Sequence, residues 1–362
     1  MLKVERLGSR SANRGSAACS DVSGIAGKDR DVMLSEAIVP RQERERAGQH
    51  RLVATALRIC RVAGRRLGLA VLALWGTVTV VFVLEQLSGS PVLLLTPPTA
   101  PPAERAAIAR SLGLDRPIFV QYWHYLTGLL RGNLGTSYFY HQSVASLVAQ
   151  MSPATLELAG VAMAIAVVIG IPLGMLAAFR HGHRDDGAVG HLMALGQAAP
   201  QFLVAPLLIS LFAVRLHLVP VSGRAGISSI VLPAVTLALF PLAVLFRVSR
   251  GAALSALGEG YVEVAKAKGC RPLRLACQHI LPNTLLPIMT VAGFLVGGLI
   301  GATVIVETIF SWPGIGYLMI QAVQVRDFPI VSGVTIVFAA AYITVNTLVD
   351  LTYTMIDPRV KA

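Results

Sequence analysis

The sequence predicts an all-α polytopic membrane protein with six transmembrane helices. Of its 362 residues, 54% are hydrophobic and 14% are charged, and the mean hydropathy is +0.66. A soluble domain of this length needs more polar surface than that composition supplies. Six apolar stretches reach the roughly 20 residues that a helix needs to cross the hydrocarbon core of a bilayer.

The six predicted spans are apolar runs bounded mostly by charged residues. Inside a bilayer such runs must satisfy their own backbone hydrogen bonds, so they form helices. They lack the two-residue alternation of a strand in a membrane β-barrel. The third run is interrupted by Pro200 and Pro206, which predicts a kink or a break in its helix. The predicted spans are residues 67–84, 158–179, 187–214, 225–246, 280–306 and 328–349.

Basic residues predict which side of the membrane each loop faces. Lys and Arg collect on the cytoplasmic side of membrane proteins, and this rule explains the net charge of +12 without nucleic acid as a partner. Four arginines precede the first span and six basic residues separate the fourth span from the fifth, whereas the short loops on the other side hold only three arginines. Both termini are therefore predicted to be cytoplasmic, with residues 85–157 as a long external loop.

Residues 1–57 are predicted to be a disordered, charged N-terminal tail, followed by a transmembrane domain over residues 58–362. The tail mixes charges of both signs with Gly and Ser, and it holds too few large apolar side chains to fold alone. No signal-peptide segment precedes the first span, which is interpreted as an uncleaved anchor. Met33 is an alternative translation start within the tail. All four cysteines fall on the cytoplasmic side of this topology, which predicts free thiols.

The stretch from Tyr261 to Asn283 is the most polar part of the second half of the chain. Residues up to Lys268 suit a helix, Gly269 permits a tight turn, and Pro272 is tolerated in the first turn of a second helix. The sequence therefore predicts two short helices that meet at a glycine. The positive charge of this stretch is also explained by an ordinary cytoplasmic loop.

The spacing within this stretch resembles the EAA loop of ABC importer permeases. In that pattern a glycine follows a glutamate by six residues, as Gly269 follows Glu263, and a Leu-Pro pair closes the loop, here at Pro282. Val264 stands where the pattern has its first alanine, and His279 stands where it has an isoleucine. The resemblance implies that this loop couples the chain to an ATPase.

Other segments resemble the dipeptide/oligopeptide permease family, in the same order and together covering roughly residues 60–360. The resemblance implies the ABC type I importer permease fold, in which six transmembrane helices carry a cytoplasmic two-helix coupling loop, here residues 251–283. Each motif is weak alone, but the ordered set is specific. The motifs are LGLDRPIFVQYWHYLTGLLRGNLGTSY (112–138), PATLELA (153–159), GIPLGMLAA (170–178), VPVSGR (219–224), VIVETIFSWPGIG (304–316) and VDLTYTMIDPRV (349–360).

The resemblance further implies one membrane subunit of an importer in a bacterial cytoplasmic (inner) membrane. Its partners would be a second permease in a heterodimer, two ATP-binding subunits, an extracytoplasmic solute-binding protein and the lipid bilayer. ATP and Mg²⁺ would be bound by the ATP-binding subunits, and this chain, which has no G-x-x-x-x-G-K-[ST] loop, would hold no cofactor. No metal-ligand or catalytic pattern appears, so no enzyme activity is expected. Di- and oligopeptides are the implied substrates, with nickel, glutathione and oligosaccharides as alternatives.

The coupling loop supplies the first group of candidate functional residues. Arg271 and Arg274 are three residues apart, so they share a helix face and would pair with acidic groups of an ATPase. The implied coupling residues are Tyr261, Glu263, Ala265, Lys268, Gly269, Arg271, Arg274, Leu281 and Pro282.

Two further groups of candidates lie in or near the spans. Polar side chains inside spans are candidates for the translocation path, although hydrogen bonds between helices explain them as well. These are Gln197, Gln201, Thr236, Thr290 and Asn346. Residues after the fifth span would form an outer gate or a platform for the binding protein, with Trp312 alternatively an anchor at the membrane interface. These are Glu307, Trp312, Pro313, Gly314 and Gly316.

Two other functions stay open from the sequence. An ion-coupled secondary transporter typically places carboxylates deep in its spans or contains inverted repeats, and neither feature is recognised here. A membrane scaffold without transport activity is disfavoured by the ordered permease motifs. ATPase partners would distinguish an importer from both alternatives.

Overall fold

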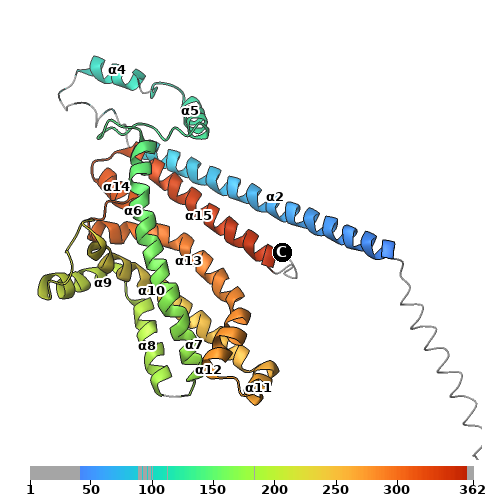
Figure 1. The fold of residues 1–362 in the computed structure, drawn as a ribbon. Coiled ribbons are helices and arrows are strands. Elements are labelled where there is room, and N and C mark those ends of the chain that lie inside the picture. The colour runs from blue at the N-terminus through green and yellow to red at the C-terminus, as the bar shows by residue number, and fades with distance from the viewer. Residues whose placement is uncertain are drawn as a thin grey trace, which may run out of the picture. The chain divides into compact units, whose positions relative to one another are not determined.

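The computed structural model describes residues 41–88, 92, 96, 99, 101–111, 113–182 and 184–356, without the side chains of residues 41–63, 184–186 and 350–356. The chain divides into two units, Met1–Gly64 and Arg65–Ala362. All features considered below belong to the second unit unless stated. Every regular element of the described residues is helical, with one isolated β-bridge between Thr136 and Ser143, so the all-α prediction is confirmed for this part of the chain (Figure 1).

Helix α2 (Arg41–Leu87) contains the first apolar span, Gly64–Leu87. The sequence predicts a disordered tail through residue 57, whereas the structure includes residues 41–57 in this helix. These residues are rich in Arg, Glu, Ala and Leu, which have high helix propensity. The prediction of disorder was based on charge and took no account of this propensity. Residues 1–40, which include the alternative start Met33, lie outside the described residues.

The predicted external loop is largely helical. It contains α4 (Pro102–Ser111) and α5 (Ile118–Leu130). Helix α6 (Val144–Ile165) begins well before residue 158, where the second span was expected to start. The charged Glu157 marked the expected start of this span, but α6 continues through both Pro153 and Glu157.

The second span continues from α6 through a π-helical turn, η1 (Ala166–Gly170), into α7 (Ile171–Phe179). The turn lies just before Pro172, whose missing N–H removes one regular helical hydrogen bond. Helix α7 packs along α10 (Ile227–Leu257), which forms the fourth span. The close approach of α7 and α10 holds this pair of spans together.

The third predicted span is a bent pair of helices. Helix α8 (Arg184–Ala198) ends before Pro200, and α9 (Gln201–Leu208) with the π-helical η2 (Ile209–Arg215) continues at an angle of 105°. The break occurs at Pro200, whereas Pro206 lies inside α9. The described residues therefore contain five continuous apolar spans, or six if the bent pair is counted as one.

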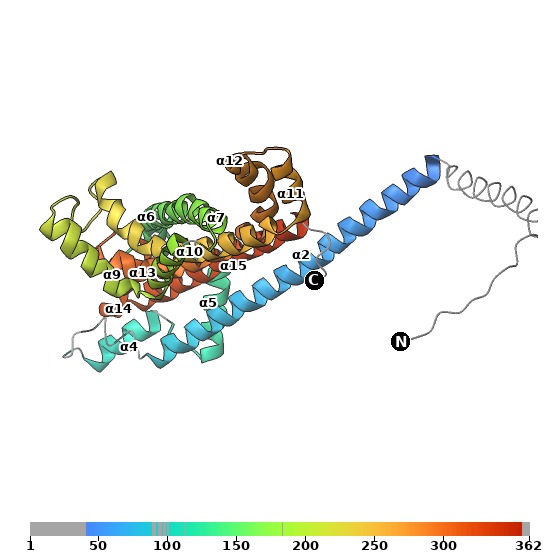
Figure 2. The same ribbon diagram turned by 90° about the horizontal axis from the view of Figure 1, so that it is seen from below.

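The last two spans are α13 (Leu281–Ile309) and α15 (Phe328–Ile356), with the short α14 (Ile315–Gln324) between them. All of the later spans extend beyond their predicted ends, and α10 continues to Leu257, into the expected coupling loop. Figure 2 shows α13 and α15 running side by side, in agreement with their many contacts. The predicted ends of the spans were placed at charged residues. A helix that extends out of the bilayer can include such residues, so the observed helices are longer.

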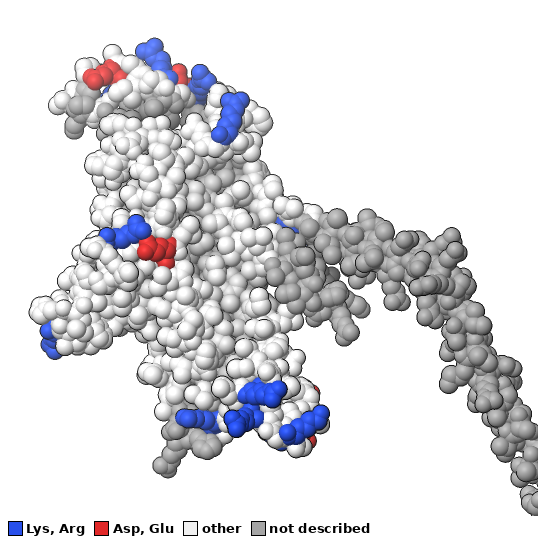
Figure 3. Space-filling model, in the orientation of Figure 1, with Lys and Arg blue, Asp and Glu red and all other residues white. Residues whose placement is uncertain are grey.

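Two ends of the helix array carry the charged side chains. Figure 3 shows Lys and Arg gathered at the end where α11 (Gly260–Ala267) and α12 (Pro272–Leu275) lie, and charges of both signs at the end where α4 lies. The surface between them is largely free of charge, as expected for helices that face lipid.

Candidate functional site

The segment between α10 and α13 contains two short helices joined by a glycine turn. Helix α11 ends at Ala267, and Gly269 follows with φ of +76°, a left-handed conformation that costs a glycine little. The Gly269 N–H donates to the Lys266 carbonyl at 2.9 Å and the Cys270 N–H to the Ala265 carbonyl at 3.1 Å. This pair of bonds is a Schellman motif, which ends α11 and turns the chain toward α12.

One side of this two-helix segment is buried against the ends of the spans. Val262 and Ala265 from α11 and Leu275 from α12 pack in one hydrophobic cluster. The span residues in that cluster include Met175 and Ala178 of α7, Ala253 and Ala256 of α10, and Ile280 just before α13. Leu281 packs against the cluster as α13 begins, and Pro282 occupies its first turn. The segment is therefore fixed to three spans through apolar contacts.

The opposite side of the segment is exposed and carries both apolar and charged groups. Leu273 is 77% exposed and Val264 is 54% exposed, beside the exposed ring of Tyr261. Apolar side chains within a polar surround are typical of protein interaction sites. The surrounding exposed charged residues are Glu263, Lys266, Lys268, Arg271 and Arg274. We call this face the α11–α12 surface.

A second site lies where three sequence motifs distant in the chain meet. The indole Nε1–H of Trp312 donates to the Ala154 carbonyl at 2.9 Å, which joins the segment after α13 to α6. The Gly223 N–H donates to the Phe310 carbonyl at 2.9 Å, which adds the loop before α10. We call Ala154, Thr155, Glu307, Trp312, Gly314 and Gly316 the Glu307 cluster.

Glu307 is the centre of this cluster and is fully buried. Its Oε1 accepts the hydroxyl of Thr155 at 2.7 Å, and its Oε2 accepts the N–H of Tyr317 at 3.0 Å. The Thr155 hydroxyl in turn accepts the N–H of Ile315 at 2.9 Å. Both backbone donors belong to the first turn of α14, where a carboxyl group satisfies otherwise free N–H groups and interacts favourably with the helix dipole.

The glycines of the cluster leave room for this carboxyl group. A Cβ at Gly314 would collide with the Glu307 carboxyl, and one at Gly316 would lie 2.6 Å from the Cα of Val304. Trp312 is only 1% exposed, with the Arg224 guanidinium 5.8 Å from its ring centre and paired with Glu157 at 2.6 Å. Trp312 is therefore not an anchor exposed to the membrane interface. Pro313 is half-buried beside it.

The candidate path residues have separate environments. The hydroxyls of Thr236 and Thr290 donate to carbonyls of their own helices, those of Leu232 and Leu286, at 2.8 and 2.9 Å. The Oδ1 of Asn346 lies close to Gly297 of α13, between two packed spans. The other two, Gln197 and Gln201, are half-buried, and Gln197 lines a cavity of 410 Å³ with Arg247 and Arg250. A role of these five residues in the path stays a prediction.

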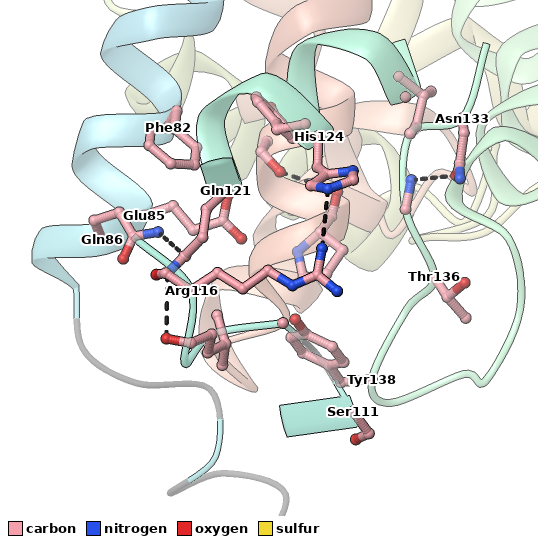
Figure 4. A pocket seen from close by; sticks show the side chains of 18 of the residues that line it. Phe82, Glu85, Gln86, Ser111, Arg116, Gln121, His124, Asn133, Thr136 and Tyr138 are labelled. Atoms are coloured by element: carbon pink, nitrogen blue, oxygen red, sulfur yellow. Dashed lines mark hydrogen bonds between the residues drawn. The ribbon is translucent and has the colours of Figure 1, made fainter. Parts of the chain in front are cut away.

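A cavity of 760 Å³ was not predicted from the sequence. We call it the Glu85 cavity. Its walls come from the end of α2, the end of α4 and the link that follows it, α5, residues 133–138 and the start of α15. Figure 4 shows Gln86 bonded to Gln121 and the Arg116 side chain reaching across to His124. In the sequence, the feature that could have pointed to this cavity is an acidic residue, Glu85, at the end of an apolar span.

Tyrosines add neutral donors to this cavity. Burial, together with the nearby negative charge of Glu85, raises the pKa of Tyr125 to about 12. The same two causes, with Asp327 contributing, raise the pKa of Tyr138 to about 12. Both phenols therefore stay protonated at neutral pH and can donate hydrogen bonds.

The wall next to Tyr138 is held by Asp327, which is 2% exposed. Its Oδ2 accepts the Ser137 hydroxyl at 2.6 Å and the Phe139 N–H at 3.0 Å. These bonds fasten residues 137–139 to the junction of α14 and α15, so this part of the cavity wall is fixed by contacts between distant segments.

Two family models match the chain. Residues 170–362 match the binding-protein-dependent transport system inner membrane component, and residues 59–159 match the N-terminal region of the same class of membrane component. The first match covers the two-helix segment and most of the Glu307 cluster, and the second covers most walls of the Glu85 cavity.

Curated relatives match along most of their length. A probable peptide ABC transporter permease of Sinorhizobium fredii is 36% identical over 301 residues, which cover 81% of this chain and 96% of the relative. The dipeptide transport system permease protein DppB of Escherichia coli is 36% identical over 330 residues, covering 82% and 97%. The di/tripeptide transport system permease DppB of Pseudomonas aeruginosa is 36% identical over 327 residues with the same coverage.

Among solved structures, the inward-facing MetNI methionine ABC transporter matches with a TM-score of 0.45 at 18% identity, over 58% of this chain and 94% of that chain. This likeness is too weak to add to the sequence matches. The family models and the near full-length relatives, together with an array of apolar helices, show that this chain belongs to the binding-protein-dependent transport system inner membrane components, the permease subunits of ABC importers.

Proposed function

We propose that this chain is a permease subunit of an ABC importer that moves di- and oligopeptides across the inner membrane. The observation that carries the proposal is the 36% identity, over 96 to 97% of their length, to permeases named for peptides and dipeptides. The transport unit would be residues 58–362, in keeping with family matches that begin at residue 59. The positive-inside distribution of Lys and Arg supports cytoplasmic termini and an external position for the Glu85 cavity and the Glu307 cluster.

Membership of the family implies ATPase and substrate-binding partners. In this proposal a second permease completes a heterodimer, two ATP-binding subunits dock on the cytoplasmic side, and a solute-binding protein delivers substrate from outside. ATP and Mg²⁺ are bound by the ATP-binding subunits, and this chain holds no cofactor and performs no catalytic step. The lipid bilayer surrounds the middle of the helix array, whose surface carries few charges.

The α11–α12 surface is proposed as the contact with an ATP-binding subunit. The exposed Val264 and Leu273 would enter an apolar groove on that subunit, and the surrounding basic residues, Arg271 and Arg274 among them, would face acidic groups. The buried side chains of the same helices contact α7 and α10. Closure of the ATP-binding subunits would therefore move the ends of these spans directly, without a flexible link.

Purification of the tagged chain from its native membrane in mild detergent tests this function. We expect a second permease and P-loop ATPases to co-purify, and the reconstituted complex with its binding protein to accumulate trialanine only when ATP is supplied. Recovery of this chain alone, from a preparation that retains other membrane complexes, would contradict the importer assignment. ATP-driven uptake of nickel, glutathione or an oligosaccharide without peptide uptake would contradict the substrate.

Replacing Leu273 tests the docking role. Because the side chain is 77% exposed, Leu273→Asp should fold and insert normally. A desolvated carboxylate in an apolar groove costs several kcal/mol, so we expect ATP-driven uptake to fall at least about tenfold. Leu273→Met keeps the apolar contact and serves as the matched control, with expected uptake within about twofold of the unsubstituted chain.

The measurements are uptake in proteoliposomes and the amount of ATP-binding subunit that co-purifies with each variant. Loss of co-purification with Leu273→Asp but not with Leu273→Met is the expected pattern. Full uptake and full co-purification with Leu273→Asp would show that this surface does not dock an ATPase.

A further inference from the structure

The Glu85 cavity is lined by two groups of opposite charge, Glu85 and Arg116. Glu85 lies on one wall, and Arg116 reaches across from the link between α4 and α5 (Figure 4). Within the described residues, no hydrogen bond or ion pair reaches the Glu85 carboxylate. A half-buried carboxylate without a partner is costly, and a cationic group that entered the cavity would offset that cost.

Arg116 is positioned for an anion. One of its nitrogens lies 3.1 Å from Nε2 of His124, and its backbone carbonyl accepts the Gln121 amide at 2.8 Å. A guanidinium carries five N–H donors, and among the described residues only this one contact occupies them. The remaining donors can form a two-point contact with a carboxylate.

The cavity has the size and the neutral groups of a small-ligand site. Its volume of 760 Å³ lies within the roughly 300–1,000 Å³ of typical ligand pockets. The protonated hydroxyl of Tyr138 can donate to a peptide carbonyl, and the side chain of Asn133 adds an amide group.

We propose that the Glu85 cavity binds a short zwitterionic peptide, whose terminal ammonium pairs with Glu85 and whose terminal carboxylate pairs with Arg116. The proposal rests on the proposed function for its substrate class. In the proposed topology the cavity is external, so it would hold a peptide between release from the binding protein and entry into the spans. It would select small ligands that carry both terminal charges.

Calorimetric titration tests the site on the full importer complex in lipid nanodiscs, without its binding protein. The ligands are trialanine, N-acetyl-trialanine, in which acetylation removes the ammonium charge, and trialanine amide, in which amidation removes the carboxylate charge. We expect trialanine to bind to the unsubstituted complex, and each blocked peptide to bind at least tenfold more weakly. This comparison requires no variant, so it decides the proposal even if a substituted chain fails to fold.

Variants assign each charge to its partner. Glu85→Gln should bind trialanine as weakly as the acetylated peptide, with no further loss on acetylation but a normal loss on amidation. Arg116→Gln should show the mirror pattern, with no further loss on amidation. Arg131→Gln is the matched control, because Arg131 is an exposed arginine that follows α5 and does not line the cavity; it should leave all three affinities unchanged.

Absence of trialanine binding to the unsubstituted complex would overturn the proposal, as would equal affinities for the three peptides. Equal weakening of all three by Glu85→Gln or Arg116→Gln would also overturn the assignment of the charges. Trialanine uptake is measured in parallel with the binding protein present. Uptake of trialanine without binding in the cavity would contradict only the proposed peptide site. Binding in the cavity without ATP-driven uptake would contradict the proposed importer function but would support the peptide site.

Discussion

Replacing Glu307 by alanine is expected to cause the largest loss of stability in this chain. The substitution leaves the Thr155 hydroxyl and the Tyr317 N–H without their acceptor in a buried site. Each buried unsatisfied group costs about 1–3 kcal/mol, so the two together should lower the free energy of unfolding by about 2–6 kcal/mol. The missing side chain also leaves a void beside Gly314 and Gly316.

Glu307→Gln should be milder than Glu307→Ala. Its amide keeps the shape and one acceptor oxygen, so the Tyr317 N–H can remain bonded, while the Thr155 hydroxyl loses its acceptor. Glu157→Ala provides the matched control, because this glutamate belongs to the same region but its side chain is 42% exposed and paired with Arg224. An exposed pair contributes about 0–1 kcal/mol.

The measurement is the fraction of monodisperse protein that survives heating in mild detergent. We expect the order of stability to be Glu157→Ala, then Glu307→Gln, then Glu307→Ala. If Glu307→Ala were as stable as Glu157→Ala, the carboxyl group would not hold α14 in place, and a role in gating alone would become the better explanation of the cluster.

Replacing Gly174 by alanine is expected to separate α7 from α10. A Cβ at Gly174 would collide with the Ser249 side chain and the Phe246 carbonyl, and would lie 3.1 Å from the backbone nitrogen of Arg250. Backbone atoms of a packed helix cannot move aside cheaply, so the overpacking should cost about 1–3 kcal/mol or more. At an unconstrained helical site, replacing Gly by Ala stabilises the helix by up to about 1 kcal/mol. At Gly174 we therefore expect a destabilisation where an unconstrained site would show a stabilisation.

Gly160→Ala is the matched control because Gly160 is exposed on α6 and a Cβ there meets nothing within 4 Å. Thermal survival in detergent should fall for Gly174→Ala and stay equal or rise for Gly160→Ala. ATP-driven uptake should also fall for Gly174→Ala, since Met175 and Ala178 of α7 pack, together with Ala253 and Ala256 of α10, against α11 and α12, which we propose contact an ATP-binding subunit. Unchanged stability and uptake would show that α7 and α10 are not held at this distance.

The chain's apolar runs and local turn residues were sufficient to predict the general architecture. Span length depends on composition over about 20 consecutive residues, and the glycine turn depends on residues within one loop, so both are local properties. The ends of the helices were less predictable. Helix α6 passes through Pro153, and α10 and α15 extend past the charged residues that had marked their ends, because backbone hydrogen bonding continues outside the bilayer.

The burial of the two glutamates at the ends of spans could not be predicted from adjacent residues. Glu157 and Glu307 were both placed at the outer edge of a span, and their own neighbours in the chain do not distinguish them. Packing buries Glu307 against Thr155, 152 residues away, and leaves Glu157 exposed beside Arg224. Glu85 likewise borders a cavity whose other walls come from α5 and α15.

By itself, the sequence determined that this protein is a helical membrane protein, the approximate positions of most of its apolar helices and the two-helix turn at Gly269. Tertiary structure alone decided which carboxylates are buried, which glycines carry close helix contacts and where a cavity forms. The physical reason is that hydrophobic length and turn conformation depend on adjacent residues, whereas burial and hydrogen-bond satisfaction depend on groups that only folding brings together.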